Sequence, residues 1–149
     1  MDADRERFLA LLAEYAALTG AKGPLEPDEN DIVTVDAGDG TMVNVCYRAS
    51  VREVRCFATV GFLPSGREAE ILRRALMRTG RGGMGFAYSL QPGTDRLVTH
   101  DSRPLGYFTD ATVLAAWIEA CIENASAFDD DGEGLPASAD GAGEVIVWS

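Results

Sequence analysis

The sequence contains a single histidine, His100, and three cysteines among its 149 residues, and it has no long uninterrupted apolar run. No metal-ligand cluster and no Cys/His pair at a catalytic spacing is present, and the G-x-S-x-G motif of hydrolases is missing. A helix that crosses a bilayer needs about 20 apolar residues in succession. We therefore expect no catalytic residue, no metal, no cofactor and no membrane span, and we expect His100 to be a surface or turn residue.

Cysteine is too scarce and too scattered to predict a disulfide framework. Cys46, Cys56 and Cys121 form no close pair, so we interpret them as small apolar side chains in a reducing compartment. Cys46 and Cys56 fall on consecutive predicted strands, which leaves a disulfide between them as the alternative. The first six residues carry mixed charge, unlike a secretory signal, and we expect a cytoplasmic protein.

Basic residues are also few, because 13 Lys and Arg stand against 24 Asp and Glu, a net charge of −11. Such a charge repels nucleic acid and anionic lipid, so we expect neither as a partner. The charge is uneven, since residues 129–149 hold six acidic and no basic side chains. Acidity therefore favours solubility and says little about the folded part.

Hydrophobic periodicity predicts eight elements. Helical spacing of apolar residues predicts helices over 5–18, 66–78 and 110–127. β-branched and alternating segments predict strands over 31–36, 41–48, 52–62, 84–90 and 95–100. The order α-βββ-α-ββ-α favours an α+β fold, an antiparallel sheet of about five strands with helices packed on it. We expect one domain over 1–128, followed by an acidic flexible linker with an apolar, strand-like tail over 129–149.

Local signals predict where the helices begin and end. Gly20 is expected to end the first helix, Ser65 and Glu68 match a capping box for the second, and Thr109 is a candidate N-cap for the third. In the third strand, alternation places Phe57 on the face opposite Val54 and its core partners. That second apolar face is a candidate binding surface.

Two motifs have stronger structural than functional interpretations. Residues 80–85, GRGGMG, match G-x-G-x-x-G, but a helix precedes and a strand follows, the reverse of a dinucleotide-binding turn. Residues 129–134 resemble the start of a calcium loop, but no helix follows them. We interpret the first as a helix end with a tight entry into a strand, and the second as a solvated linker.

The tail over 144–149, EVIVWS, is apolar and follows the acidic linker. For Trp148 the sequence leaves three alternatives open: packing on its own subunit, insertion into a neighbouring subunit or a client groove, or disorder. We hypothesise that Val145–Trp148 occupies an apolar groove or a sheet edge while no client is bound.

Residues 71–90, ILRRALMRTGRGGMGFAYSL, resemble the middle of the class I type III secretion system chaperones, the Tir-chaperone or CesT-like family. In that family a short helix of the pattern L-L-x-x-N/L-x-x-x-G leads through a glycine-rich stretch into a strand. The element order, the length and the low pI of about 4.4 also match, over about residues 5–128. Arg78 and Thr79 stand where the family has an asparagine.

The resemblance implies a bacterial cytoplasmic, virulence-associated homodimer that binds the N-terminal segment of a secreted effector in extended form. The effector stays soluble and export-competent without ATP or metal, through strand addition at a sheet edge and apolar side chains in grooves. The export ATPase is a further candidate partner. The implied dimer interface comprises Leu72, Leu76, Met77, Phe86 and Tyr88. The implied effector-binding residues are Leu12, Tyr15, Val33, Val35, Val43, Val45 and Phe57.

Other interpretations remain open. The effector-binding residues could instead all be core, with Phe57 the best candidate for binding because of its face. The chain could be a regulatory protein-binding domain of the same fold without an export role. A small-molecule-binding domain is a third alternative, and it would require a deep pocket with strongly shifted carboxylates.

Overall fold

The computed structural model describes residues 2–21, 25–36, 41–79, 85–126 and 135 of the chain. The elements are α1 (Ala3–Thr19), β1 (Ile32–Asp36), β2 (Met42–Arg48), β3 (Glu53–Phe62), α2 (Glu68–Arg78), β4 (Ala87–Leu90), β5 (Arg96–Pro104), the 3-10 turn η1 (Leu105–Tyr107) and α3 (Ala111–Ala125). The order α-βββ-α-ββ-α and the α+β class predicted from the sequence are confirmed.

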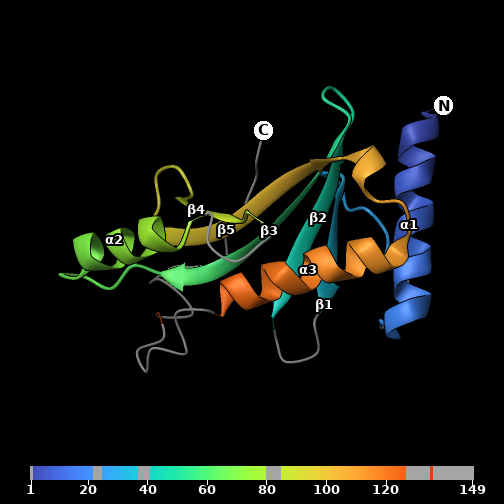
Figure 1. The fold of residues 1–149 in the computed structure, drawn as a ribbon. Coiled ribbons are helices and arrows are strands. Elements are labelled where there is room, and N and C mark those ends of the chain that lie inside the picture. The colour runs from blue at the N-terminus through green and yellow to red at the C-terminus, as the bar shows by residue number, and fades with distance from the viewer. Residues whose placement is uncertain (1, 22–24, 37–40, 80–84, 127–134, 136–149) are drawn as a thin grey trace.

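The strands form one sheet in the order β1-β2-β3-β5-β4, and every neighbouring pair is antiparallel. The edges are therefore β1 and β4, and the ten-residue β3 lies at the centre. A bulge between Thr59 and Gly61 shifts the register of β3 against β5. Bulges bend a strand and increase its twist, and the sheet in Figure 1 curves along its length.

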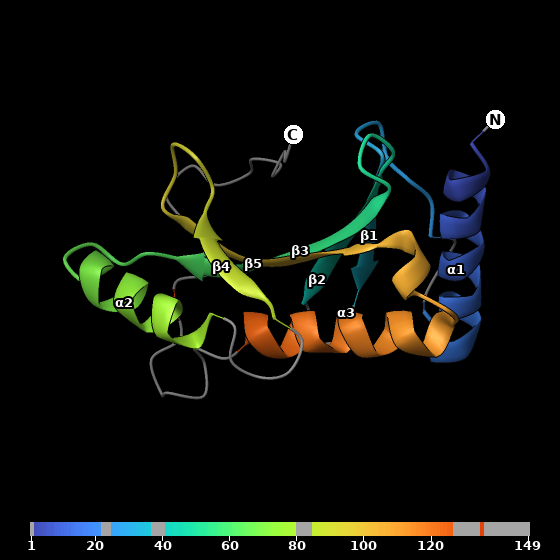
Figure 2. The same cartoon turned by 45° about the horizontal axis from the view of Figure 1, so that its top comes forward.

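The helices lie on one side of the sheet. Figure 2 shows α3 and α2 beneath the strands, with α1 across the far end. Helix α3 contacts β2, β3, β5 and α1, whereas α2 contacts β4. On this side of the sheet the described residues form two apolar clusters: a main core under the centre of the sheet and a smaller one at the α2 end.

Helix α3 places Trp117 at the centre of the main core, where its side chain is fully buried. The rings of Phe86 and Phe108 lie 6.1 and 4.9 Å from that of Trp117, centroid to centroid. The indole Nε1 donates a hydrogen bond of 2.8 Å to Oδ2 of Asp101 on β5. Arg103 Nε donates to the same oxygen at 2.7 Å, so a largely buried carboxylate has both an indole and a guanidinium partner.

This network explains why β5 is longer than its sequence predicts. Alternation predicted a strand over 95–100, yet β5 continues to Pro104 through Asp101, Ser102 and Arg103. These polar residues are compatible with a strand because Asp101 and Arg103 pair with each other on the helix-covered face. Strand β4 begins at Ala87 rather than 84, and α3 ends at Ala125 rather than 127.

Two predicted helix caps are wrong. Asp110, not Thr109, caps α3, because its side chain accepts from the backbone N–H groups of Thr112 and Val113. The Ser65–Glu68 capping box does not form, since Gly66 at φ +86° turns the chain and α2 begins only at Glu68, after Arg67. The Gly20 stop is confirmed, with φ +70° and its N–H bonded to the Ala16 carbonyl.

The cysteines are free thiols. Cys46 lies opposite Arg55 on β3, and Cys56 lies opposite Val45, so the two thiols are on opposite faces of the sheet. The alternative of a Cys46–Cys56 disulfide is therefore excluded by the strand register. The predicted hairpin loop at 37–40, the glycine-rich motif at 80–85 and the predicted tail at 129–149 lie outside the described residues, apart from Gly85 and Leu135.

We predict that Trp117→Phe lowers the free energy of unfolding by about 2–4 kcal/mol, because it removes buried volume and a hydrogen bond to Asp101. Urea denaturation followed by far-UV circular dichroism measures the change. Val51→Ala, at a half-exposed turn position, is the control and is expected to change stability by less than about 0.5 kcal/mol. A loss below about 1 kcal/mol for Trp117→Phe would contradict a central role for this side chain.

Candidate protein-binding surfaces

Six of the seven predicted effector-binding residues lie in the main core. Their side chains are at most 6% exposed and join α1 to the covered face of the sheet. In this conformation a partner can reach the backbone of β1 but not these side chains without displacing α1. The six are Leu12, Tyr15, Val33, Val35, Val43 and Val45.

Phe57, the seventh, lies on the opposite side of the sheet. Strand register places it in one row with Asn44 on β2 and His100 on β5. With Ile32 and Val98 it forms a separate apolar cluster, against which Cys46 packs. We call this side the open face, defined by Ile32, Cys46, Arg55, Phe57, Val98 and His100. The sequence prediction that Phe57 faces away from Val54 and the core is confirmed.

A hollow of about 160 Å³ lies at the β1 end of the open face. Phe57, Ile32 and Cys46 give it an apolar lining, while Asp31 and Arg48 add charge. Apolar walls with a few polar groups suit an inserted apolar side chain. The complete lining is Asn30, Asp31, Ile32, Cys46, Tyr47, Arg48 and Phe57.

His100 brings a titratable group to the open face, half-buried within β5 rather than in a turn. Its Nε2 is hydrogen-bonded to Ser89 Oγ on β4. Burial lowers the pKa of His100 below its ordinary value of 6.5, the Arg55 charge lowers it further, and Asp101 opposes both effects. The imidazole is therefore held in its neutral form at neutral pH, as a packed polar group rather than a cation.

The predicted dimer residues divide into two groups. Leu76 and Met77 on α2 are 73% and 59% exposed, and Leu72 is half-buried beside them. Phe86 and Tyr88 are buried in the chain's own core, where Phe86 packs near Trp117 and the Tyr88 hydroxyl donates to the Asn124 carbonyl at 2.9 Å. The structure thus brings together Leu72, Leu76 and Met77 on one helix beside the edge strand β4.

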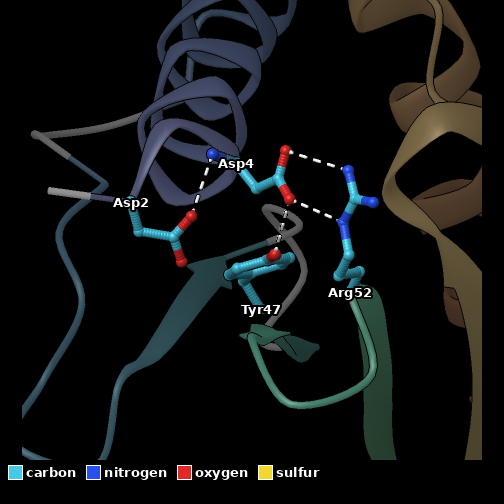
Figure 3. Close-up of polar contacts among 4 residues, drawn as sticks. All are labelled: Asp2, Asp4, Tyr47 and Arg52. Atoms are coloured by element: carbon cyan, nitrogen blue, oxygen red, sulfur yellow. Dashed lines mark hydrogen bonds and ion pairs between the residues drawn. The ribbon is translucent and has the colours of Figure 1, made fainter.

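Asp4 joins the start of α1 to strand β2 and to the β2–β3 turn. Figure 3 shows Asp4 of α1 bonded to Arg52 of the β2–β3 turn and to the Tyr47 hydroxyl. Arg52 Nε lies 2.7 Å from Asp4 Oδ2, and Asp2 caps the helix by accepting from the Asp4 N–H. The turn holds Arg52 at φ +55°, and a hollow of about 390 Å³ lies between this turn and Pro104, Leu105 and Gly106.

Sequence reasoning missed several exposed apolar residues. Met42 at the start of β2, Val51 in the β2–β3 turn and Tyr107 of η1 are each more than a third exposed, as is Leu18 near the end of α1. Met42, Val51 and Tyr107 fall at an element end or in a turn, where periodicity gives no face. Leu18 continues the apolar spacing of α1, yet it is exposed near the end of that helix. Their exposure is a property of the tertiary structure, so only the fold could identify them.

Comparison with known proteins was made by sequence and by structure. No family model and no curated protein matches the sequence. By structure, a chain of the HopA1–SchA chaperone–effector complex matches with a TM-score of 0.70 and 12% identity, covering 87% of this chain and 98% of that one. A chain of the Yersinia pestis type III secretion chaperone SycH bound to a YscM2 fragment matches with a TM-score of 0.60 and 20% identity, over 80% and 98%.

The chain shares its fold with the matched chain of each of these secretion chaperone complexes. The same comparison also finds E. coli YbjN, described as a putative transcription regulator, with a TM-score of 0.61 and 12% identity over 86% of this chain and 96% of that one. The match extends over nearly the whole of each neighbouring chain, 98%, 98% and 96% of their lengths. At these identities the likeness establishes architecture, and function needs a separate argument.

Within the described ranges, no group of three or more His, Cys, Asp or Glu side chains is arranged to hold a metal ion. A search of the same residues finds no helix with the length and apolar character that a bilayer crossing requires. The burial of Cys56 raises the pKa of its thiol well above the ordinary value, so this cysteine is a packing residue rather than a nucleophile.

We predict that folding stability falls as pH drops through 6.5, in part because of His100. Its pKa is lower in the folded chain than in the unfolded one, so the unfolded state binds the proton first and gains stability on acidification. The contribution is fully present above 6.5 and is lost toward the lower folded pKa. Urea denaturation above and below that pH measures it, and His100→Gln, which cannot be protonated, should flatten the slope. An equal slope in both proteins would contradict the assignment.

Proposed function

We propose that this chain is a type III secretion chaperone that binds the N-terminal segment of a secreted effector in extended form. The observation that carries the proposal is the whole-length match of its fold to a chain of a chaperone–effector complex, 87% of this chain and 98% of that one. The independent resemblance of residues 71–90 to the same family supports it. The client is kept soluble and export-competent by binding alone.

The surfaces for an extended client are the edge strand β1 and the open face. Strand β1 pairs with β2 on one side, so its other side can accept a further strand by main-chain hydrogen bonds. The hollow lined by Ile32, Cys46 and Phe57 begins beside that edge. A client strand along β1 could therefore place alternate side chains toward the hollow. Met42, exposed where β2 begins, extends the apolar surface.

The dimer is proposed to form through α2. Leu76 and Met77 expose most of their apolar surface, and the half-buried Leu72 continues it toward β4. Exposed apolar side chains gathered on one helix are typical of an interaction site. Two-fold pairing of α2 would cover both copies of this surface and would double the client-binding surfaces of the assembly.

The remaining parts of the proposal concern the cell. A chaperone of this kind acts in the bacterial cytoplasm and passes its client to the export machinery, with the export ATPase as a candidate partner. The net charge of −11 disfavours nucleic acid as a partner. No nucleotide or metal is needed, because strand addition and apolar contacts supply the binding free energy.

A regulatory protein-binding domain is the second candidate, and the fold of YbjN favours it. The two functions share the binding surfaces and differ in the partner. A secretion client has an extended N-terminal segment that is exported, whereas a regulatory partner is retained in the cell. The identity of the bound region of the partner therefore separates the two.

We predict that the 15.9-kDa chain is a dimer at micromolar concentration and that Leu76→Glu makes it monomeric. A charge in the centre of a buried apolar interface should weaken dimerisation by roughly 30-fold or more. Light scattering coupled to size-exclusion chromatography measures the mass. Val51→Glu is the matched control, since Val51 is likewise an exposed apolar residue, at 50%, but lies in the β2–β3 turn. A dimer that persists in Leu76→Glu would contradict the α2 interface.

The function itself is tested by affinity capture of the tagged chain from its host. The proposal predicts co-purification of a protein whose first ~100 residues lack stable structure and bind on their own. Removing those residues from the captured protein should abolish binding, whereas removing its C-terminal half should not. A partner bound only through a folded domain would favour the regulatory alternative and would contradict the chaperone role.

A further inference from the structure

The side chains at the centre of the open face are as deeply buried as those of the main core. Phe57 is 1% exposed and Val98 is 0% exposed, and Ile32 beside them is buried. Yet α2 and α3 lie beneath the sheet, on its other side, and α1 crosses its far end (Figure 2). In its register row Phe57 is flanked by Asn44 and His100, which are polar. Burial of this degree on a sheet face calls for a further layer over it.

We propose that this layer is the chain's own apolar segment over 144–149, EVIVWS, with Val145–Trp148 docked across the open face. The segment supplies three β-branched residues and one tryptophan, the residue types that pack best on a pleated sheet. Covering Phe57 with them removes apolar surface of both partners from water. The inference concerns the chain without a client, so it does not rest on the proposed function.

The path of the chain makes the docking feasible. Leu135, like Leu72 and Leu90, packs against the apolar cluster at the α2 end. Val145 lies ten positions after Leu135, and an extended chain of ten steps reaches about 33 Å. From the edge strand β4 to β3, which carries Phe57, the distance is two strand spacings, about 10 Å. The segment can therefore pass round the β4 edge and lie on the open face.

Charge also favours this occupant. Asp140 and Glu144 precede the apolar residues, and no Lys or Arg occurs after residue 128. The open face presents Arg55 in its centre, with Nε donating to Ser102 Oγ at 3.2 Å, and Arg48 near the β1 end. The acidic residues before the apolar segment would be attracted to these guanidinium groups, while Glu53 at the start of β3 would repel them.

The Cys46 thiol is a chemical probe of whether the open face is covered. It belongs to the open face, whereas Cys56 and Cys121 are fully buried in the main core. We predict that a chain truncated after Leu135 shows at least about a fivefold faster alkylation of Cys46 by iodoacetamide than the full chain. Mass spectrometry of the peptides measures each thiol separately. Cys56 and Cys121 should stay protected in both proteins, which shows that the truncated chain remains folded.

Point variants keep the test independent of truncation. Ile146→Asp should expose Cys46 as truncation does, because it places a charge in the apolar segment, and Ser138→Ala in the linker is the matched control and should not. A synthetic peptide of residues 140–149 should restore protection to the truncated chain. Equal Cys46 rates in full and truncated chains would overturn the proposal. Protection that is lost when the full chain is diluted would overturn it too, because the covering segment would then come from a second copy.

Discussion

The structure depends on the burial of one face of a five-stranded sheet by α3. Trp117 fills the centre of that interface, and its indole N–H is bonded to Asp101, which also holds Arg103. Because the Asp101 carboxylate accepts from both the indole and the guanidinium, the polar end of β5 can continue to Pro104. Helix α1 then packs on α3 and on the β1–β2 end, with Asp4 and Arg52 fixing the corner (Figure 3).

A sheet covered on one side has three surfaces left for other molecules: two edges and one face. Here β1 and β4 are the edges, and the open face carries Phe57 at its centre. The β4 edge adjoins the exposed Leu76 and Met77 of α2, whereas the β1 edge adjoins the hollow beside Ile32. The proposed dimer interface and the proposed client surface therefore lie at opposite ends of the same one-sided sheet.

Much of the fold could be predicted from the sequence because each element carries its own period. The strand order could not be predicted, since tertiary packing places β5 between β3 and β4. The length of β5 could not be predicted either, because its polar end is stabilised by the hydrogen bonds of Asp101 with Arg103 and Trp117. The face of Phe57 was predictable from alternation. Whether Val33 and Val43 belong to the core or to a binding surface was not predictable from the sequence. Apolar strand residues have the same pattern whether a helix of the chain or a client covers them.

The central claim is that the uncovered parts of this sheet hold an extended protein segment. Hydrogen–deuterium exchange of the chain, with and without the N-terminal segment of a captured client, tests it most directly. The account predicts slower exchange along β1 on binding, together with strand-like protection of the client segment, and unchanged exchange in α3, which is already buried. Protection confined to α3 or to the turn at Arg52, with β1 unchanged, would contradict it.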